Sequence, residues 1–237
     1  MHIERRFNGP PDSAHGGVAC GVFAGAVDSR QATVRLTAPP PLDTDFDVVD
    51  ADGWRVITGP DGPVARVRRW DVPVGLDPLP LVDASHIERG HAWWRENVLE
   101  THQFPTCFGC GHERRPGDGL FLHPGVVEGS EYKADVWTPA EGETDDHWVW
   151  AAVDCPSGWG TMALGEVSPG LAPMLLGELS LVITKSPVPG TEYQVVARPA
   201  GQDGRKRWSD VALVAPDGEN IARGRSTWIR LTEEGGS

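Results

Sequence analysis

The chain has 237 residues, a net charge of −13 and 39% hydrophobic residues, a composition that describes a globular protein with enough apolar material for a core. The negative charge argues against sequence-independent binding to nucleic acid, which requires a basic surface. No apolar run approaches the roughly 20 residues of a membrane span, no secretory leader opens the chain, and the four cysteines are too few for a disulfide scaffold, so a cytoplasmic protein is expected.

The first part of the chain predicts one buried helix followed by strands. His15, Gly16 and Gly17 precede a small, apolar, nearly uncharged segment at residues 18–27, which is long enough for a buried helix although its glycines weaken helix formation. Four apolar runs separated by turns then indicate strands, because Asp-Gly pairs favour hairpin turns. These strands are expected at residues 32–36, 46–49, 54–58 and 64–67.

A connection follows, and then a second set of the same kind. Apolar residues at helical spacing predict a helix over residues 84–99, with Ile87, His91, Trp94 and Val98 on one face. A second buried, helix-like segment covers residues 148–153. Further strands are expected at residues 120–122, 132–137, 179–184, 193–197, 208–214 and 221–231.

Two diverged copies of one unit explain this order of elements. Residues 44–49 (Thr-Asp-Phe-Asp-Val-Val) reappear 147 positions later as residues 191–196 (Thr-Glu-Tyr-Gln-Val-Val), each after a proline-rich turn. The Pro-Asp-Gly turn at residues 60–62 has a counterpart at residues 216–218. The sequence therefore predicts an α+β protein whose units each pack an antiparallel sheet on a central helix. The N-terminal unit is expected at residues 1–70, a connecting segment with a helix at 71–106 and the C-terminal unit at 107–237.

Two motifs carry a resemblance to a known family. The segment Cys-Phe-Gly-Cys-Gly at residues 107–111, followed by Gly119 and Leu120, resembles the opening of hotdog-fold thioesterases. The His-Gly-Gly at residues 15–17 is similar to the helix start of the phenylacetate-pathway type of hotdog thioesterase. The resemblance implies a double hotdog, a fused pseudo-dimer of two units, and leaves further association into homo-oligomers open. It also implies that an active site takes a backbone N–H from one unit and an Asp or Glu from the other.

Counting along the sequence shows how the halves divide these elements. In the family, the acid lies nine positions after the His of His-Gly-Gly; in the first half that position holds Ala24, which cannot serve. In the second half Asp154 stands nine positions after Asp145, where no His-Gly-Gly is present. The resemblance thus implies one complete site, with Gly17 from the first half and Asp154 from the second, and one site that has lost its function.

The expected activity is hydrolysis of an acyl-CoA or a related thioester. The Gly17 amide at a helix N-terminus would polarise the thioester carbonyl. Burial near tryptophans would raise the pKa of Asp154 and suit it to act as a base or a nucleophile. His15 is expected to fix the helix start or to bind a substrate hydroxyl. Ser157 is expected to orient water, although Pro156 should distort the helix there.

Further residues are expected to contact the substrate. Gly16 and Trp150 lie beside the predicted site in the sequence, while Arg205 and Lys206 form the best local cluster for the phosphates of CoA. No cofactor is expected apart from the CoA that belongs to the substrate. An alternative is a binding protein that holds an acyl or aromatic ligand without catalysis. A hydratase is disfavoured because the chain has no segment like Asp-x-Asn-Pro-x-His.

The cysteines allow a metal site, but their pattern favours a structural turn without a metal. Cys107 and Cys110 have the spacing of a zinc knuckle, and His112 and His123 offer two further ligands. No second Cys pair exists, so the prediction is a structural turn that holds small buried thiols, without a metal. Neither of the other two cysteines has an obvious base beside it, so no Cys nucleophile is expected.

Overall fold

The computed structural model describes residues 1–71, 76–162 and 173–231. Each predicted helix is present, and so is every predicted strand except the one expected at residues 120–122. The helical elements are η1 (Arg5–Phe7), α1 (Gly16–Ala24), α2 (Ala84–Asn97), η2 (Leu99–Thr101) and α3 (Asp146–Gly160). The strands are β1 (Gln31–Leu36), β2 (Asp47–Ala51), β3 (Trp54–Gly59), β4 (Gly62–Arg69), β5 (Lys133–Trp137), β6 (Met174–Ile183), β7 (Tyr193–Asp203), β8 (Lys206–Val214) and β9 (Asn220–Arg230). Among the described residues, no helix is long and apolar enough to cross a membrane.

The nine strands form one antiparallel sheet in the order β2-β3-β4-β1-β6-β9-β8-β7-β5. The two halves of the chain meet at its centre, where β1 pairs with β6. Thr33 lies opposite Ser180 in this pair, their hydroxyl oxygens are 2.8 Å apart, and the two residues are separated by 147 positions. A residue that pairs with its own repeat counterpart marks a pseudo-twofold axis. The repeat read from the sequence is therefore confirmed in space.

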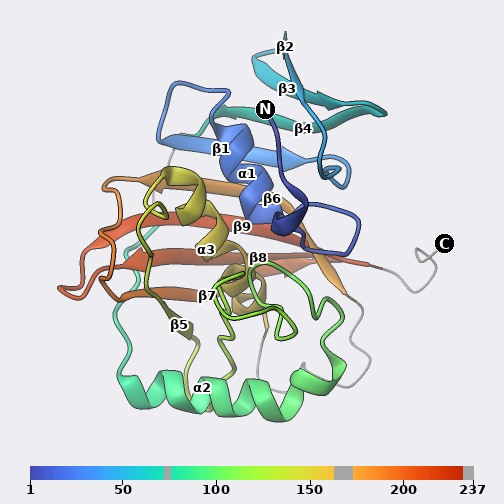
Figure 1. Ribbon diagram of the computed structural model, residues 1–237. Coiled ribbons are helices and arrows are strands. Elements are labelled where there is room, and N and C mark those ends of the chain that lie inside the picture. Colours follow the sequence, from blue (N-terminus) through green and yellow to red (C-terminus); the bar gives the residue numbers. More distant parts are fainter. Residues whose placement is uncertain (72–75, 163–172, 232–237) are drawn as a thin grey trace.

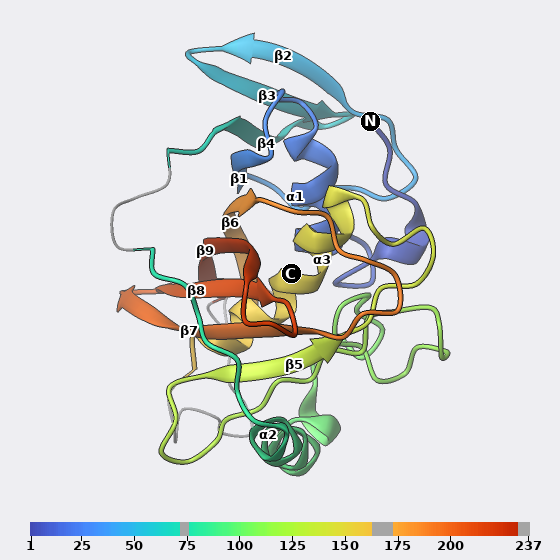
Figure 2. The same cartoon turned by 90° about the vertical axis from the view of Figure 1, so that its left-hand side faces the viewer.

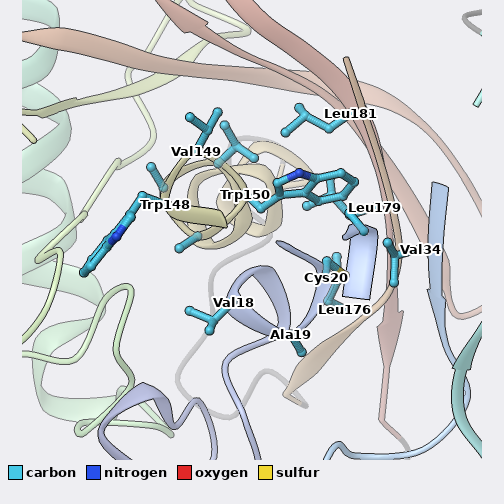
Figure 3. Close-up of a cluster of buried hydrophobic side chains, with 14 of the residues drawn as sticks. Val18, Ala19, Cys20, Val34, Trp148, Val149, Trp150, Leu176, Leu179 and Leu181 are labelled. Atoms are coloured by element: carbon cyan, nitrogen blue, oxygen red, sulfur yellow. The ribbon is translucent and has the colours of Figure 1, made fainter. Parts of the chain in front are cut away.

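The helices α1 and α3 pack against each other in the concave face of this sheet (Figures 1 and 2). Both consist mainly of small or apolar residues that are buried on several sides, as in a helix enclosed by its surroundings. Figure 3 shows Val18, Ala19 and Cys20 of α1 in the buried cluster beside α3, together with Leu179 of β6. The core thus lies between the two central helices and the sheet.

The third helix, α2, covers the outer side of the C-terminal half (Figure 2). It begins at the cap Asp83, whose side chain accepts a hydrogen bond from the His86 amide at 2.8 Å. Ile87 and Trp94 are buried as the helical spacing predicts. Along β7 the side chains alternate between two clusters: Val195 faces the central core, and Val196 lies with Ile87. This alternation explains why a strand buried on both faces reads as a continuous apolar run.

Two sequence expectations differ from the structure. Residues 120–122 are not a strand, because Phe121 has a φ of 54°, outside the extended region. Instead the amides of Leu120 and Leu122 donate to the carbonyls of Phe108 and Gly109 at 2.9 Å, so this run lines the Cys-x-x-Cys loop. The helix α3 continues through Pro156 without a break. The proposed boundaries between the two units and the connection stay predictions.

Candidate active site

The predicted pair from the two halves meets where α1 crosses α3. The Gly17 amide of α1 donates to Asp154 Oδ2 of α3 over 2.6 Å. Only 2% of Asp154 is exposed, and its other oxygen, Oδ1, is buried and has no hydrogen-bond partner among the described residues. A carboxylate with one oxygen held and the other unsatisfied in the interior is costly to keep, which is typical of a site retained for its chemistry.

His15 supports both sides of this contact. It is the N-cap of α1, and its Nδ1 accepts a hydrogen bond from the Val18 amide at 3.3 Å, as expected for a residue that fixes the helix start. An accepting Nδ1 leaves the ring proton on Nε2. That atom lies 3.2 Å from Asp154 Oδ2 and 3.3 Å from Cys155 Sγ. His15 thus holds the carboxylate in place through the same oxygen that Gly17 contacts.

Burial sets the electrostatics of the site. It raises the pKa of Asp154 to about 6, against the charge of His15 and the hydrogen bond from Gly17, which both lower it. Burial alone would lower the pKa of His15, but the negative charges of Asp154 and Cys107 outweigh it and the pKa is raised. Hydrogen bonds from Cys110 and Cys155 hold the pKa of Cys107 below its usual range. The carboxyl group is therefore a stronger base than an exposed Asp.

Glycine is required at position 17 by the neighbouring helix. A Cβ there would lie 2.5 Å from Asp154 Cβ, 3.0 Å from Ala151 Cα and closer still to the Trp150 carbonyl oxygen. The absence of a side chain at position 17 therefore lets α3 pack closely against α1. Gly16, one residue earlier, lines the adjacent cavity, where a Cβ would lie 2.9 Å from Leu176 Cδ2.

A cavity of about 390 Å³ opens beside Asp154. His15 and Gly16 line it together with Asp154, and its surface is mostly apolar. Its lining residues include, from the second half of the chain, Cys155, Trp159, Met174, Leu176, Arg207, Trp228 and Arg230. A mostly apolar hollow with a few convergent polar groups is the usual form of a small-molecule site.

Three of the predicted substrate contacts lie elsewhere. Trp150 is 3% exposed and packs in the central core beside Leu179 rather than on the described lining of the cavity (Figure 3). Arg205 and Lys206 are exposed and are likewise absent from that lining, whereas Arg207 is part of it. Side chains alternate between the two faces of β8, so Lys206 and its neighbour Arg207 point to opposite faces of the sheet.

Ser157 has a structural place in α3. Its hydroxyl donates to the Asp154 carbonyl oxygen at 2.7 Å and accepts from Trp228 Nε1 at 3.0 Å, and the residue is fully buried. With its proton committed to the helix backbone, it is not placed to orient water. It instead ties α3 to β9 next to Pro156, which has no N–H of its own.

The pseudo-symmetric side of the molecule lacks both elements. Ala24 stands where Asp154 stands in the other half, and Asp146 and His147 replace the two glycines. These three residues line a second hollow, where Asp146 is paired with Arg30 at 2.6 Å. Ala24 offers no carboxylate at the position that Asp154 occupies in the other half, so among the described residues the contact of such a carboxylate with a glycine amide of a helix N-terminus is found on the Gly17 side.

Comparison with known proteins gives the fold. No protein-family model matches the sequence, and no curated protein matches it. An acyl-CoA thioesterase II from Mycobacterium marinum superposes with a TM-score of 0.56 at 13% identity, covering 99% of this chain and 93% of its own. A protein from Novosphingobium aromaticivorans, named as a candidate thioesterase, gives 0.59 at 12%, covering 98% and 94%.

A third solved structure carries the name of the fold itself. A conserved protein of unknown function with a hot dog fold, from Alicyclobacillus acidocaldarius, gives a TM-score of 0.55 at 12% identity and covers 97% of this chain and 91% of its own. Similarity at this identity establishes the fold rather than the activity. The predicted architecture is confirmed: the chain has an α+β double hotdog fold, in which one antiparallel sheet encloses two central helices.

Proposed function

We propose that the protein hydrolyses an acyl-CoA or a related thioester at a single active site between its two halves. The observation that carries this proposal is the contact between the buried Asp154 carboxylate of α3 and the N-terminal turn of α1, beside a mostly apolar cavity. A carboxylate base, helix-terminal amides and an apolar pocket are what hydrolysis of an acyl thioester requires. The names of the solved relatives, thioesterases among them, support the same reaction class.

The reaction follows from the unequal surroundings of the two carboxylate oxygens. Gly17 and His15 hold Asp154 Oδ2, which leaves Oδ1 to take a proton from water as its oxygen attacks the thioester carbon. The carbonyl oxygen gains negative charge next to the N-terminus of α1, where the Gly17 amide, released in part by Asp154, and the amide of Gly16 stabilise it. Collapse of the tetrahedral intermediate breaks the C–S bond. The thiolate then takes the proton from Asp154, giving an acid and a free thiol.

The substrate enters as a complete thioester, so no separate cofactor is involved. The acyl group would occupy the apolar part of the cavity, against Leu176 and Trp228. Arg207 and Arg230 line the same cavity and would face the anionic part of CoA. We assign this role to them in place of Arg205 and Lys206.

Free-thiol release from short, long and aromatic acyl-CoAs tests the proposal. Asp154→Asn keeps the shape of the side chain but removes the base, so we expect kcat to fall by about a hundredfold or more. Asp146→Asn is the matched control, because it changes a carboxylate on the same helix at the inactive side, and it should retain activity. Equal activity of the Asp154→Asn variant and the native protein would refute the mechanism. A single turnover in heavy-oxygen water separates the two roles of Asp154, since label in its carboxylate would reveal a nucleophile.

One observation favours a second candidate, a non-catalytic protein that binds an acyl or aromatic ligand. The Gly17 amide already donates to Asp154, so a carbonyl must compete for it. A binding protein would take up acyl-CoA without releasing thiol, and Asp154→Asn would leave its affinity unchanged. Thiol release by the native protein alone would exclude this candidate.

A further inference from the structure

Three of the four cysteines gather beside the candidate active site. Cys107 and Cys110 lie on the loop before β5, Cys155 lies on α3, and all three are buried in one cluster. The Sγ atoms of Cys107 and Cys155 are 3.8 Å apart, so the two thiols are in direct contact. Hydrolysis as proposed uses none of these thiols, so their convergence needs a separate explanation.

The cavity beside Asp154 gives small molecules a path to these buried thiols. Cys107, Cys110 and Cys155 are each 5–7% exposed, and all three line the cavity. The fourth cysteine, Cys20, is 0% exposed and packs in the central core rather than on the described lining of the cavity. A reagent of about the size of water that enters the cavity therefore reaches the cluster but not Cys20.

The surroundings of Cys107 favour its thiolate form. One imidazole nitrogen of His15 and the Sγ atoms of Cys107 and Cys155 all lie within 4.8 Å of one another. Hydrogen bonds from Cys110 and Cys155, together with the nearby imidazole, hold the pKa of Cys107 well below its usual range, although burial opposes this. Burial instead raises the pKa of Cys20. The thiolate is the nucleophilic form of cysteine, so Cys107 is the reactive thiol of the cluster.

The loop that carries Cys107 lies directly against Cys155. A Cβ on Gly109 would lie 2.5 Å from Cys155 Sγ and 2.5 Å from His15 Nε2, so a side chain there would displace both groups. The Gly111 amide donates to the Cys107 carbonyl at 2.8 Å and closes a tight turn of the loop, which is green in Figure 1. A disulfide needs its sulfurs about 2.0 Å apart, so the two sulfurs have to approach by about 2 Å.

Cys155 is better placed than Cys110 to react with Cys107. Cys110 Sγ lies 3.4 Å from His102 Nε2, and burial lowers the pKa of His102 to about 4, so this neutral ring competes for the thiol proton of Cys110. His15 Nε2 lies 3.3 Å from Cys155 Sγ, but this nitrogen carries a proton and acts as a donor. The thiol of Cys155 is therefore left to face Cys107.

We propose that Cys107 and Cys155 form a redox-active pair that a small hydroperoxide converts into a disulfide between the loop and α3. The sequence did not predict this pair, because Cys155 and His15 lie far from Cys107 along the chain. Low-pKa thiols that lie next to a second cysteine are the usual targets of peroxide oxidation. The proposal is independent of hydrolysis, because it concerns the thiols alone.

The reaction has two steps, and hydrogen peroxide is its oxidant. The Cys107 thiolate attacks one peroxide oxygen, the O–O bond breaks, and the other oxygen leaves as water after taking a proton, so Cys107 becomes a sulfenic acid. The Cys155 sulfur then attacks the Cys107 sulfur. The S–S bond forms, the S–O bond breaks, and the hydroxyl group leaves as a second water with the proton of Cys155.

Thiol counting in the full chain tests the pair. The reduced protein, freed of reductant and treated with an equimolar amount of hydrogen peroxide, should show two titratable thiols after denaturation in place of four. Dithiothreitol should restore all four. Digestion without a reductant, after alkylation of the remaining thiols, should yield a linked peptide that contains Cys107 and Cys155.

Cysteine variants assign the role of each thiol. Cys107→Ala should lower the rate of peroxide-dependent thiol loss by at least about tenfold, because the attacking thiolate is removed. Cys20→Ala is the matched control: it makes the same change at a buried thiol outside the cluster and should keep the native rate. Cys110→Ala should still form the bridge between Cys107 and Cys155.

The native chain keeps the test decisive if a variant does not fold, since its linked peptides identify the bridge directly. A native chain that retains four titratable thiols after peroxide treatment would overturn the proposal. Equal rates of thiol loss in Cys107→Ala and Cys20→Ala would also overturn it. A linked peptide that joins Cys107 to Cys110 would overturn the assignment of Cys155 as the partner.

Discussion

The substitution Gly17→Ala distinguishes the role of Gly17 in helix packing from its proposed role in catalysis. In Gly17→Ala the new Cβ would lie 2.5 Å from Asp154 Cβ, where ordinary contact begins at 3.4 Å. Neither the Trp150 carbonyl nor the backbone of α3 can turn away as a flexible side chain could. The helices must therefore separate by about 1 Å at this point, in a core that is packed as densely as a crystal.

The size of the effect follows from two contributions. Overpacking of this kind costs about 1–3 kcal/mol, and loosening a buried hydrogen bond to a charged group costs about 1.5–3 kcal/mol. For a chain of this length, a loss of about 3–5 kcal/mol lowers the Tm by roughly 10 °C. If the Gly17 amide stabilises the transition state, kcat also falls by about a hundredfold or more, the usual effect of losing one such donor.

Thermal unfolding followed by circular dichroism, and initial rates corrected for the folded fraction, measure the two effects. Gly21→Ala is the matched control on the same helix: its Cβ would lie 2.7 Å from His147 Cα, but on the inactive side. It should lose comparable stability and keep its kcat. A Gly17→Ala variant with native kcat and a lowered Tm would refute the proposed catalytic role of the amide. Equal losses of kcat in both variants would attribute the effect to general displacement of the helices.

Substitutions at other residues test the positions that the structure gives to their side chains. Ser157→Ala should lower stability by about 1–3 kcal/mol, because it leaves a buried indole N–H without its acceptor, and a denaturant titration should show this while kcat stays native. Arg207→Ala should raise KM for acyl-CoA but not for the corresponding acyl-pantetheine, whereas Arg205→Ala should change neither value. His91 donates to Asp135 at 2.8 Å, and that hydrogen bond raises its pKa. The stabilisation is therefore complete below about pH 6.5 and is lost as the pH rises through the folded pKa; His91→Ala should flatten the stability curve in that range, and an unchanged curve would contradict it.

The repeat predicted from the sequence proved informative because it concerns the backbone. An offset of 147 positions survives side-chain divergence, and the β1–β6 pairing places Thr33 opposite the residue with that separation. The contact between Gly17 and Asp154 could be anticipated for a similar reason. Both positions came from the resemblance to hotdog thioesterases, in which the acid lies nine positions after the His of His-Gly-Gly, and a position along a helix fixes which turn carries the side chain.

The direction in which each side chain points was harder to predict from the sequence. The helix α3 is apolar on nearly all sides, so no stripe in its sequence indicates which face meets the cavity, and Trp150 was assigned to the wrong surroundings. On β8 a shift of one residue decided between Lys206, which is exposed, and Arg207, which lines the cavity. Cys155 of α3 joins the Cys-x-x-Cys pair in one buried cluster, and no local pattern in the sequence predicts this contact.

The two close contacts between α1 and α3 show how a fused pair satisfies packing twice while placing a carboxylate against a helix start at only one of these contacts. At each contact one glycine of α1 lets α3 approach closely: Gly17 lies against Ala151, and Gly21 lies against His147. In the aligned halves Gly17 corresponds to His147, and Gly21 to Ala151. Close packing of α1 on α3 therefore requires one glycine at each contact, but either helix can provide it. Gly17 lies in the first turn of α1, so no side chain covers that turn and its amide reaches the Asp154 carboxylate. Gly21 lies one turn later in α1, and the first turn of α3 that faces it carries the side chain of His147. Packing is satisfied in both cases, so the core does not require the proposed catalytic arrangement at both contacts.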